Sequence, residues 1–192
     1  PSFIVQNMGG AGGTKAANFL YTRGLKDGTM IGILLSDTPL ASRLRTTGVK
    51  YVAKEFQFLG GADQPRSAFV VYKTTGVKSL DDAKKTQVIL GSTGKGSQTY
   101  VLPTLVNSML GTKFKVITGY RGMGGIYLAM DKAEVKGFQS SWSGYKIARP
   151  HLVDKINVIA ANALTPLKDR PDVPLLKDLM TNPEDKKVAE LL

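Results

Sequence analysis

Short apolar runs alternate along the chain with glycine-rich or polar segments, and this alternation predicts strands joined by helices. Runs of strand length occur at residues 3–5, 30–35, 56–60, 68–72, 87–90, 114–118, 135–138 and 156–160. Apolar positions at helical spacing predict helices at residues 16–20, 41–45, 99–110, 126–133, 147–152 and 175–180, with others beginning at Ser79 and Asn182. Strands that alternate with helices are typical of an α/β fold with a parallel sheet.

One unit, residues 87–110, places a glycine-rich turn between a strand and a helix. The turn spans residues 91–98 and reads Gly-Ser-Thr-Gly-Lys-Gly-Ser-Gln. Backbone N–H groups at the start of a helix lack helical partners, and the helix dipole is positive there. Because glycines let an anion approach the backbone closely, we predict an anion or a water molecule at the N–H groups of residues 94–97. Pro103 removes one backbone bond, so either the helix kinks there or its regular part begins later than Ser97.

The first unit predicts a strand, a glycine loop, a helix and a strand over residues 3–35, which is a right-handed βαβ arrangement. Its loop contains Gly9, Gly10, Gly12 and Gly13. One interpretation is the loop of a nucleotide-binding α/β enzyme, with Asp37 as the ribose-binding acid, although Lys15 stands where a third small residue belongs. A second is a backbone cradle for a carboxylate or a water-bridged anion. A third is a tight turn without a ligand.

Composition excludes several classes of site and partner. The 192 residues include no cysteine and a single histidine, which excludes thiolate metal sites and disfavours the usual zinc and iron ligand sets. The net charge is +11, but the basic residues are scattered, so we expect no nucleic-acid partner. No apolar run reaches membrane-spanning length. The chain begins with neither an initiator methionine nor a signal peptide, so we expect a removed targeting segment or an internal start.

Catalytic motifs are missing from the sequence. No serine lies in a Gly-x-Ser-x-Gly pattern, and Gly96 follows Lys95 where a phosphate-binding P-loop requires Ser or Thr. Several strand-to-helix glycine loops without a catalyst favour a binding protein over an enzyme. We expect no cofactor.

Several motifs, in order along the chain, resemble those of the solute-binding receptors of tripartite tricarboxylate transporters, the TctC-like or Bug family. The matching segments are the glycine loop of residues 5–13, the turn of residues 26–29, the helix start of residues 77–82, the Gly-Ser-x-Gly-x-Gly-Ser loop of residues 91–97, the loop of residues 119–122 and the Arg-Pro-Asp-Val-Pro segment of residues 170–174. Each motif is weak alone, but six in order form a strong signal.

The resemblance implies a periplasmic-binding-protein-like α/β fold of two lobes that close on a ligand, known as a Venus flytrap. Residues 1–72 and 157–192 would form the first lobe, and residues 73–156 the second. The ligand would be a small carboxylate: a di- or tricarboxylate, an acidic amino acid or an aromatic acid. The candidate ligand-binding residues are Gly10, Ala11, Gly12, Gly13, Thr14, Asp37, Ser92, Thr93, Gly94, Lys95, Gly96, Ser97, Tyr120, Arg121, Gly122 and Ser140.

The resemblance also implies a periplasmic location and membrane transporter subunits as partners. Members of the family begin one strand-helix unit earlier and continue beyond residue 192. We therefore expect a first lobe that is incomplete, with residues 3–5 and 30–35 lacking the strand between them, and a possible homodimer through exposed strand edges. Ser140 lies in a Gln-Ser-Ser segment where the family often has an acid, and this change favours a more anionic ligand.

Overall fold

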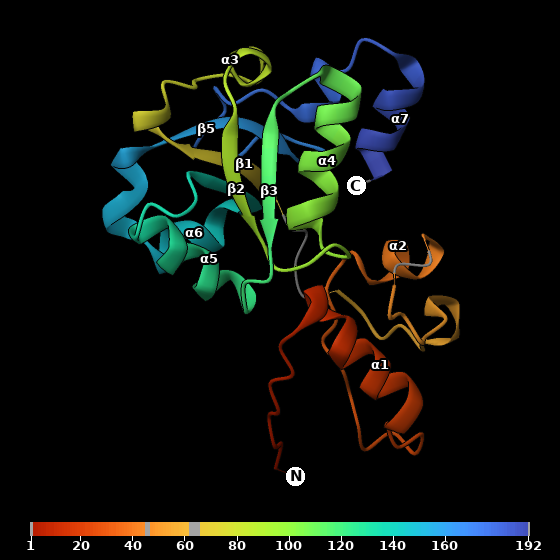
Figure 1. The fold of residues 1–192 in the computed structure, drawn as a ribbon. Coiled ribbons are helices and arrows are strands. Elements are labelled where there is room, and N and C mark those ends of the chain that lie inside the picture. The colour runs from red at the N-terminus through yellow and green to blue at the C-terminus, as the bar shows by residue number, and fades with distance from the viewer. Residues whose placement is uncertain (1, 45–46, 62–65, 192) are drawn as a thin grey trace.

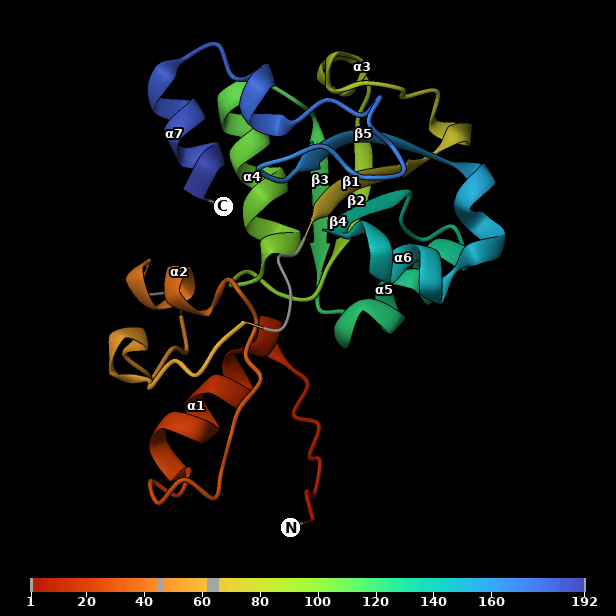
Figure 2. The same ribbon diagram turned by 180° about the vertical axis from the view of Figure 1, so that it is seen from behind.

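A single mixed sheet with helices on both faces forms the larger part of the molecule, as a computed structural model of the chain shows (Figures 1 and 2). The structure describes residues 2–44, 47–61 and 66–191. Residues 66–191 contain the sheet and its covering helices, and the segment of residues 2–61 lies beside one end of the sheet. We call these parts the sheet body and the N-terminal segment.

The sheet has the strand order β3-β2-β4-β1-β5. Its strands are β1 (Ser67–Tyr72), β2 (Val88–Ser92), β3 (Phe114–Thr118), β4 (Gly137–Ser141) and β5 (Ile156–Asn162). Strand β2 runs parallel to β3 and β4, whereas β1 is antiparallel to both β4 and β5. The carboxyl ends of β2, β3, β4 and β5 therefore meet at one edge of the sheet, together with the start of β1.

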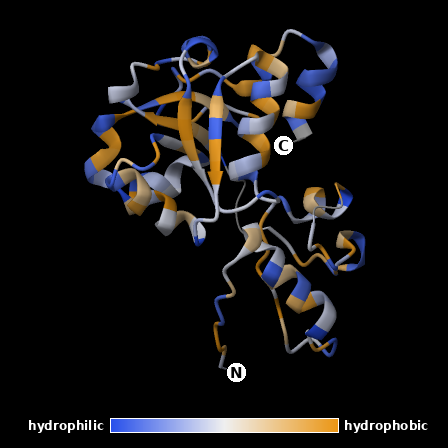
Figure 3. Cartoon of the chain, viewed as in Figure 1, coloured by the Kyte–Doolittle hydropathy of each residue, from blue (hydrophilic) through white to orange (hydrophobic). Residues whose placement is uncertain are grey.

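Each face of the sheet has its own hydrophobic core. The helices of the sheet body are α3 (Leu80–Lys85), α4 (Gln98–Leu110), α5 (Gly122–Asp131), α6 (Trp142–Ala148) and α7 (Pro183–Leu191), with 3-10 turns at Lys73–Thr75, Pro150–Lys155 and Leu176–Leu179. Phe69 and Leu90 pack with Leu102 of α4 on one face. Phe138 packs with Ile126 of α5 and Tyr145 of α6 on the other. Apolar residues accordingly concentrate in the strands (Figure 3).

Several local predictions for the sheet body are confirmed. A capping box begins α3, because Asp82 N–H donates to Ser79 Oγ while the Asp82 carboxylate accepts from the Ser79 amide. Helix α4 begins directly after Ser97 and ends at Gly111, whose φ of 72° suits glycine. Pro103 lies inside this helix, so the regular part of the helix does not begin after the proline.

The expected βαβ unit of residues 3–35 is not formed. The N-terminal segment contains a 3-10 turn (Ala11–Gly13), α1 (Thr14–Arg23), α2 (Thr38–Arg43) and a second 3-10 turn (Ala53–Glu55), and its described residues include no strand. The runs at residues 3–5, 30–35 and 56–60 were predicted as strands, but none of them forms a strand in the structure. Phe3 is 85% exposed and Ile33 is 95% exposed. A lone strand finds no hydrogen-bond partners, so the apolar pattern by itself does not produce a sheet.

The expected lobe boundaries do not follow the sheet. Strand β1 pairs with β4 along residues 67–71, and β5 pairs with β1. Both β1 and β5 were assigned to a first lobe of residues 1–72 and 157–192, yet they belong to the same sheet as the strands of residues 73–156. The reason is that β1, antiparallel to its neighbours, bridges β4 and β5. The lobe boundaries themselves stay a prediction.

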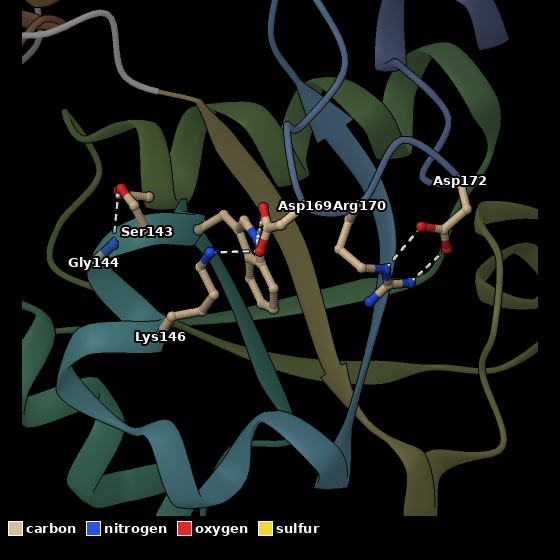
Figure 4. Close-up of polar contacts among 8 residues, drawn as sticks. Ser143, Gly144, Lys146, Asp169, Arg170 and Asp172 are labelled. Atoms are coloured by element: carbon tan, nitrogen blue, oxygen red, sulfur yellow. Dashed lines mark hydrogen bonds and ion pairs between the residues drawn. The ribbon is translucent and has the colours of Figure 1, made fainter.

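The predicted polar turn of residues 139–143 is also wrong. Residues Gln139 to Ser141 continue β4, and Trp142 begins α6 with Ser141 Oγ accepting the Gly144 N–H at 3.2 Å. The loop after β5 is fastened to this helix (Figure 4), because Asp169 accepts hydrogen bonds from Lys146 Nζ and Trp142 Nε1. In the same loop, Arg170 donates two hydrogen bonds to the carboxylate of Asp172, at 2.9 and 2.8 Å.

Candidate functional site

The carboxyl edge of the sheet contains a change in chain direction. After β2 the chain crosses through α4 to β3 on one side, and after β3 it crosses through α5 to β4 on the other side of β2. In α/β sheets the loops diverge at such a point, and ligands commonly bind in the opening between them. The turn between β2 and α4 lies at this position, so the fold places the predicted anion site where ligand sites are usual.

Hydroxyl groups hold the turn in shape. Thr99 Oγ1 lies 2.6 Å from Ser97 Oγ and 3.0 Å from Ser92 Oγ, and it accepts the Thr93 N–H at 3.1 Å. Ser97 Oγ also donates to the Gly94 carbonyl at 2.8 Å. Ser92, Ser97 and Thr99 are all buried. These hydroxyls bond to one another and to the turn's backbone, so their role is to fix its geometry.

Two of the four amides predicted to face an anion are paired inside the protein. The Gly94 N–H donates to Ser92 Oγ at 3.2 Å, and the Ser97 N–H donates to the Gly94 carbonyl at 3.1 Å. For these two amides the prediction is wrong, because the turn folds back on itself. No residue within the described ranges accepts a hydrogen bond from the amides of Lys95 and Gly96. Of these two residues, Lys95 is exposed and Gly96 is buried.

The first amide of α4 carries a carboxylate from elsewhere in the chain. The Gln98 N–H donates to Asp37 Oδ2 at 2.7 Å. Asp37 directly precedes α2 of the N-terminal segment, but its side chain does not cap that helix. The sequence suggested a ribose-binding role for this acid. In the structure, Asp37 instead accepts a hydrogen bond at the start of α4. The nucleotide-binding geometry is absent as well, because no strand leads into the glycine loop.

Asp37 is buried and only half satisfied. The residue is 6% exposed, and Oδ1 has no hydrogen-bond partner among the described residues. Desolvation raises the pKa of this carboxyl, and the hydrogen bond from the Gln98 amide opposes the rise only in part. Tyr51 lies close enough for the Asp37 charge to raise the tyrosine pKa, second to its own desolvation. The site thus contains a carboxylate in surroundings that favour its release or protonation.

The glycine loop of the N-terminal segment lies directly against the turn. A Cβ atom on Gly12 would come within 2.8 Å of Ser97 Cβ, and one on Gly94 would come within 3.2 Å of the Gly12 nitrogen. Gly12 has a φ of 61°, which favours glycine, and Gly13 has a φ of 88°. The structure therefore brings together the two loops that the sequence singled out.

The remaining predicted residues lie around this contact. Gly10 accepts the Gly13 N–H, Thr14 is buried at the first position of α1, and Ala11 has a positive φ of 48°. The Tyr120 N–H donates to the Ser92 carbonyl at 3.3 Å, which places the end of β3 beside the turn. Exposed Arg121 and Gly122 follow at the start of α5. Ser140 pairs with Ala68, whose side chain packs in the core away from α4.

Sequence reasoning missed two polar residues at this edge. Thr99 organises the turn, and its position two residues after Ser97 was the available signal. Gln139 is fully buried; its Nε2 donates to Ser67 Oγ at 2.6 Å, and its Oε1 has no partner among the described residues. Because Gln139 pairs with Phe69, it points to the α4 side of the sheet. Only the strand register reveals this.

Other candidate features lie elsewhere or are absent. Two surface hollows of about 490 and 600 Å³ border Lys73, and neither includes a residue of the turn. Residues 2–44, 47–61 and 66–191 contain no group of three histidine or carboxylate side chains placed to hold a metal ion. None of the described helices has both the length and the apolar character needed to cross a bilayer.

Comparisons with known proteins identify the fold. No protein-family profile and no curated protein sequence matches the chain. Among solved structures, a periplasmic transporter protein matches 91% of this chain with a TM-score of 0.74 and 20% identity. A TctC solute-binding protein from Polaromonas matches 79% of the chain, with a TM-score of 0.57 and 18% identity. An R. palustris protein solved with adipate matches 65%, with a TM-score of 0.51 and 14% identity.

These similarities establish the fold and no more. The architecture is that of the periplasmic solute-binding proteins, including the TctC type, so the fold class expected from the sequence is confirmed. The chain spans 60% of the length of the periplasmic transporter protein and 59% of the Polaromonas protein. This partial coverage agrees with the N-terminal segment that lacks a sheet of its own.

Proposed function

We propose that the protein binds a small carboxylate anion at the start of α4, between the turn of residues 92–98 and the glycine loop of residues 10–14. The observation that carries this proposal is the contact between the Asp37 carboxylate and the Gln98 amide at 2.7 Å. This contact supports a carboxylate site at this helix terminus, where the helix dipole stabilises negative charge. The amides of Lys95 and Gly96, which have no acceptor among the described residues, add two donors that Asp37 does not use.

The wider role follows from the fold. The architecture is shared with a periplasmic transporter protein and a TctC solute-binding protein, and a further similar structure was solved with adipate. We infer that the protein is a periplasmic receptor that delivers its carboxylate to the membrane subunits of a tripartite tricarboxylate-type transporter. It acts as a binding protein and not as an enzyme. Strand β3 ends the sheet with an exposed outer edge, where Ile117 is 37% exposed, and this edge is our candidate for a homodimer contact.

Calorimetric titration with a carboxylate panel tests the proposal. We expect at least one of succinate, malate, adipate, glutamate and benzoate to bind, and its affinity to fall as salt is added, because the contact is electrostatic and the protein carries a net charge of +11. NAD and a DNA duplex serve as controls and should not bind. If every carboxylate fails, or if NAD binds instead, the proposal is wrong.

A substitution in the glycine loop gives a second prediction. Gly12→Ala places a methyl group against Ser97 and requires alanine to adopt a φ of 61°, so the loop must move away from the turn. We expect about tenfold weaker carboxylate binding by calorimetry. Gly28→Ala is the matched control, since Gly28 also has a positive φ of 86° but its Cβ would meet nothing within 4 Å. Equal affinities for the two variants would remove the glycine loop from the site.

A further inference from the structure

Asp37 has a different role from that of an ordinary capping residue. It comes from the N-terminal segment and reaches across to α4 of the sheet body, where its Oδ2 accepts the Gln98 N–H. Only 6% of the Asp37 surface is exposed, and its Oδ1 has no hydrogen-bond partner among the described residues. A carboxylate that served only to cap α4 would be expected to satisfy both oxygens or to leave one in water.

The position of Asp37 coincides with the anion site. An external carboxylate that used the amides of Lys95 and Gly96, which have no acceptor among the described residues, would lie at the same helix terminus as the Asp37 carboxylate. Two carboxylates at contact distance in a partly buried site repel strongly. The site therefore accommodates one of them in ionised form at a time.

We propose that Asp37 is an internal competitor: its carboxylate occupies the α4 terminus in the ligand-free protein, and a carboxylate ligand must displace it to bind. This inference rests on the proposed function and specifies how that site is regulated. Exchange is favourable for two reasons. The ligand gains donors that Asp37 does not use, and the released Asp37 regains hydration at the oxygen that is unpaired in the closed site.

Displacement also has a structural consequence. Asp37 directly precedes α2, and Tyr51 of the same segment fastens that helix by donating its hydroxyl hydrogen to the Thr38 carbonyl at 3.1 Å. Release of Asp37 therefore removes the hydrogen bond that joins the start of α2 to the start of α4. Ligand binding and the contact between the N-terminal segment and the sheet body are thereby coupled.

Succinate titrations of three proteins test the competition. Asp37→Asn removes the competing charge with little change in shape, and Asp37→Ala removes the competing side chain entirely. Asp178→Asn is the control, because it removes one exposed carboxylate from the sheet body outside the turn and the glycine loop. We expect succinate to bind both Asp37 variants at least tenfold more tightly than the wild type or the control. Equal or weaker binding by both Asp37 variants overturns the competition, since Asp37 would then be neutral or a ligand contact.

An amide resonance separates this inference from the proposed function. The ¹⁵N–¹H signal of Gln98 is expected to shift on Asp37→Asn without any ligand, and then to respond to added succinate or inorganic phosphate more strongly than in the wild type. If the variant takes up phosphate at Gln98 but no carboxylate of the panel, Asp37 still competes with an anion at this terminus, and the proposed carboxylate ligand is wrong. If the signal of the variant responds to neither anion, both fail. Circular dichroism verifies that each variant is folded.

Discussion

At the scale of single residues, the site depends on a carboxylate whose role its own helix does not explain. Asp37 lies at the N-terminal end of α2 yet bonds to the first amide of α4. Its environment is unfavourable for charge, since desolvation raises its pKa more than the Gln98 bond lowers it. The other clearly shifted acids behave in the opposite way: hydrogen bonds lower the pKa of Asp82 and Asp169. Asp37 is therefore the acid that weakens the fold when it ionises.

This difference predicts how stability depends on pH. In the unfolded chain Asp37 loses its proton near the ordinary aspartate pKa, of about 4, whereas the folded protein keeps the proton to higher pH. Between these two pKa values the folded state binds more protons, so the free energy of unfolding contributed by Asp37 falls as the pH rises. In Asp37→Asn the side chain does not titrate, so this decrease in the free energy of unfolding is absent.

Urea unfolding of both proteins between pH 4 and pH 7 is the measurement. The stability of Asp37→Asn relative to the wild type is expected to increase as the pH rises through this window. The contributions of Asp82 and Asp169 cancel in the comparison, because both proteins contain them. A difference that stays constant with pH would contradict the raised pKa.

At the scale of elements, β4 shows how a single glycine lets neighbouring strands pack closely. Gly137 begins β4 and pairs with Val71 of β1 and with Leu90 of β2. A Cβ on Gly137 would come 2.1 Å from the Val70 carbonyl oxygen and 3.0 Å from Val71 Cα, so only glycine lets these strands approach. This contact joins the parallel and antiparallel halves of the sheet.

Gly137→Ala should therefore be strongly destabilising. Because backbone atoms must move to admit the methyl group, we expect a loss of more than about 2 kcal/mol in the free energy of unfolding. Gly124→Ala in α5 is the control: its Cβ would meet nothing within 4 Å, and alanine is the better helix former. Chemical denaturation should rank the control at or above the wild type. A Gly137→Ala protein as stable as the wild type would contradict the described β1–β4 contact.

At the scale of the whole molecule, the two parts differ in how they are held together. The sheet body has a core on each face, whereas the N-terminal segment leaves Phe3, Ile33 and Phe58 at least 85% exposed. Described residues of the segment contribute no strand to any sheet. Because these apolar side chains bury little surface, local opening of the segment should cost little free energy.

Amide hydrogen exchange measures this difference directly. We expect the slowest exchange in β1 and β4, which are central strands buried on both sides, and fast exchange at residues 29–35. Protection should be lower in residues 2–61 than in residues 66–191. Added succinate should change exchange at Gln98 and around Asp37 without affecting β1. Uniform protection along the chain would show instead that the N-terminal segment unfolds together with the sheet body.

The sequence by itself determined the elements whose signals are local. Strands β1, β2, β3 and β5, the first part of β4 and the capping box at Ser79 follow from apolar runs, glycines and capping residues that act within a few positions of each other. The order of motifs also indicated the fold class correctly. The turn of residues 91–98 was recognisable for the same reason, since a strand, a glycine turn and a helix start are contiguous in sequence.

Only the tertiary structure decided which groups share the site and which strands form. The runs at residues 3–5 and 30–35 have strand composition, but a strand requires a partner, and none is present beside them. Strand β1 joined the same sheet as β4 because pairing depends on distant residues. Asp37 and Gln98 are 61 positions apart, and no local pattern links them. Their contact depends on how the N-terminal segment packs on the sheet body, which is a property of the assembled molecule.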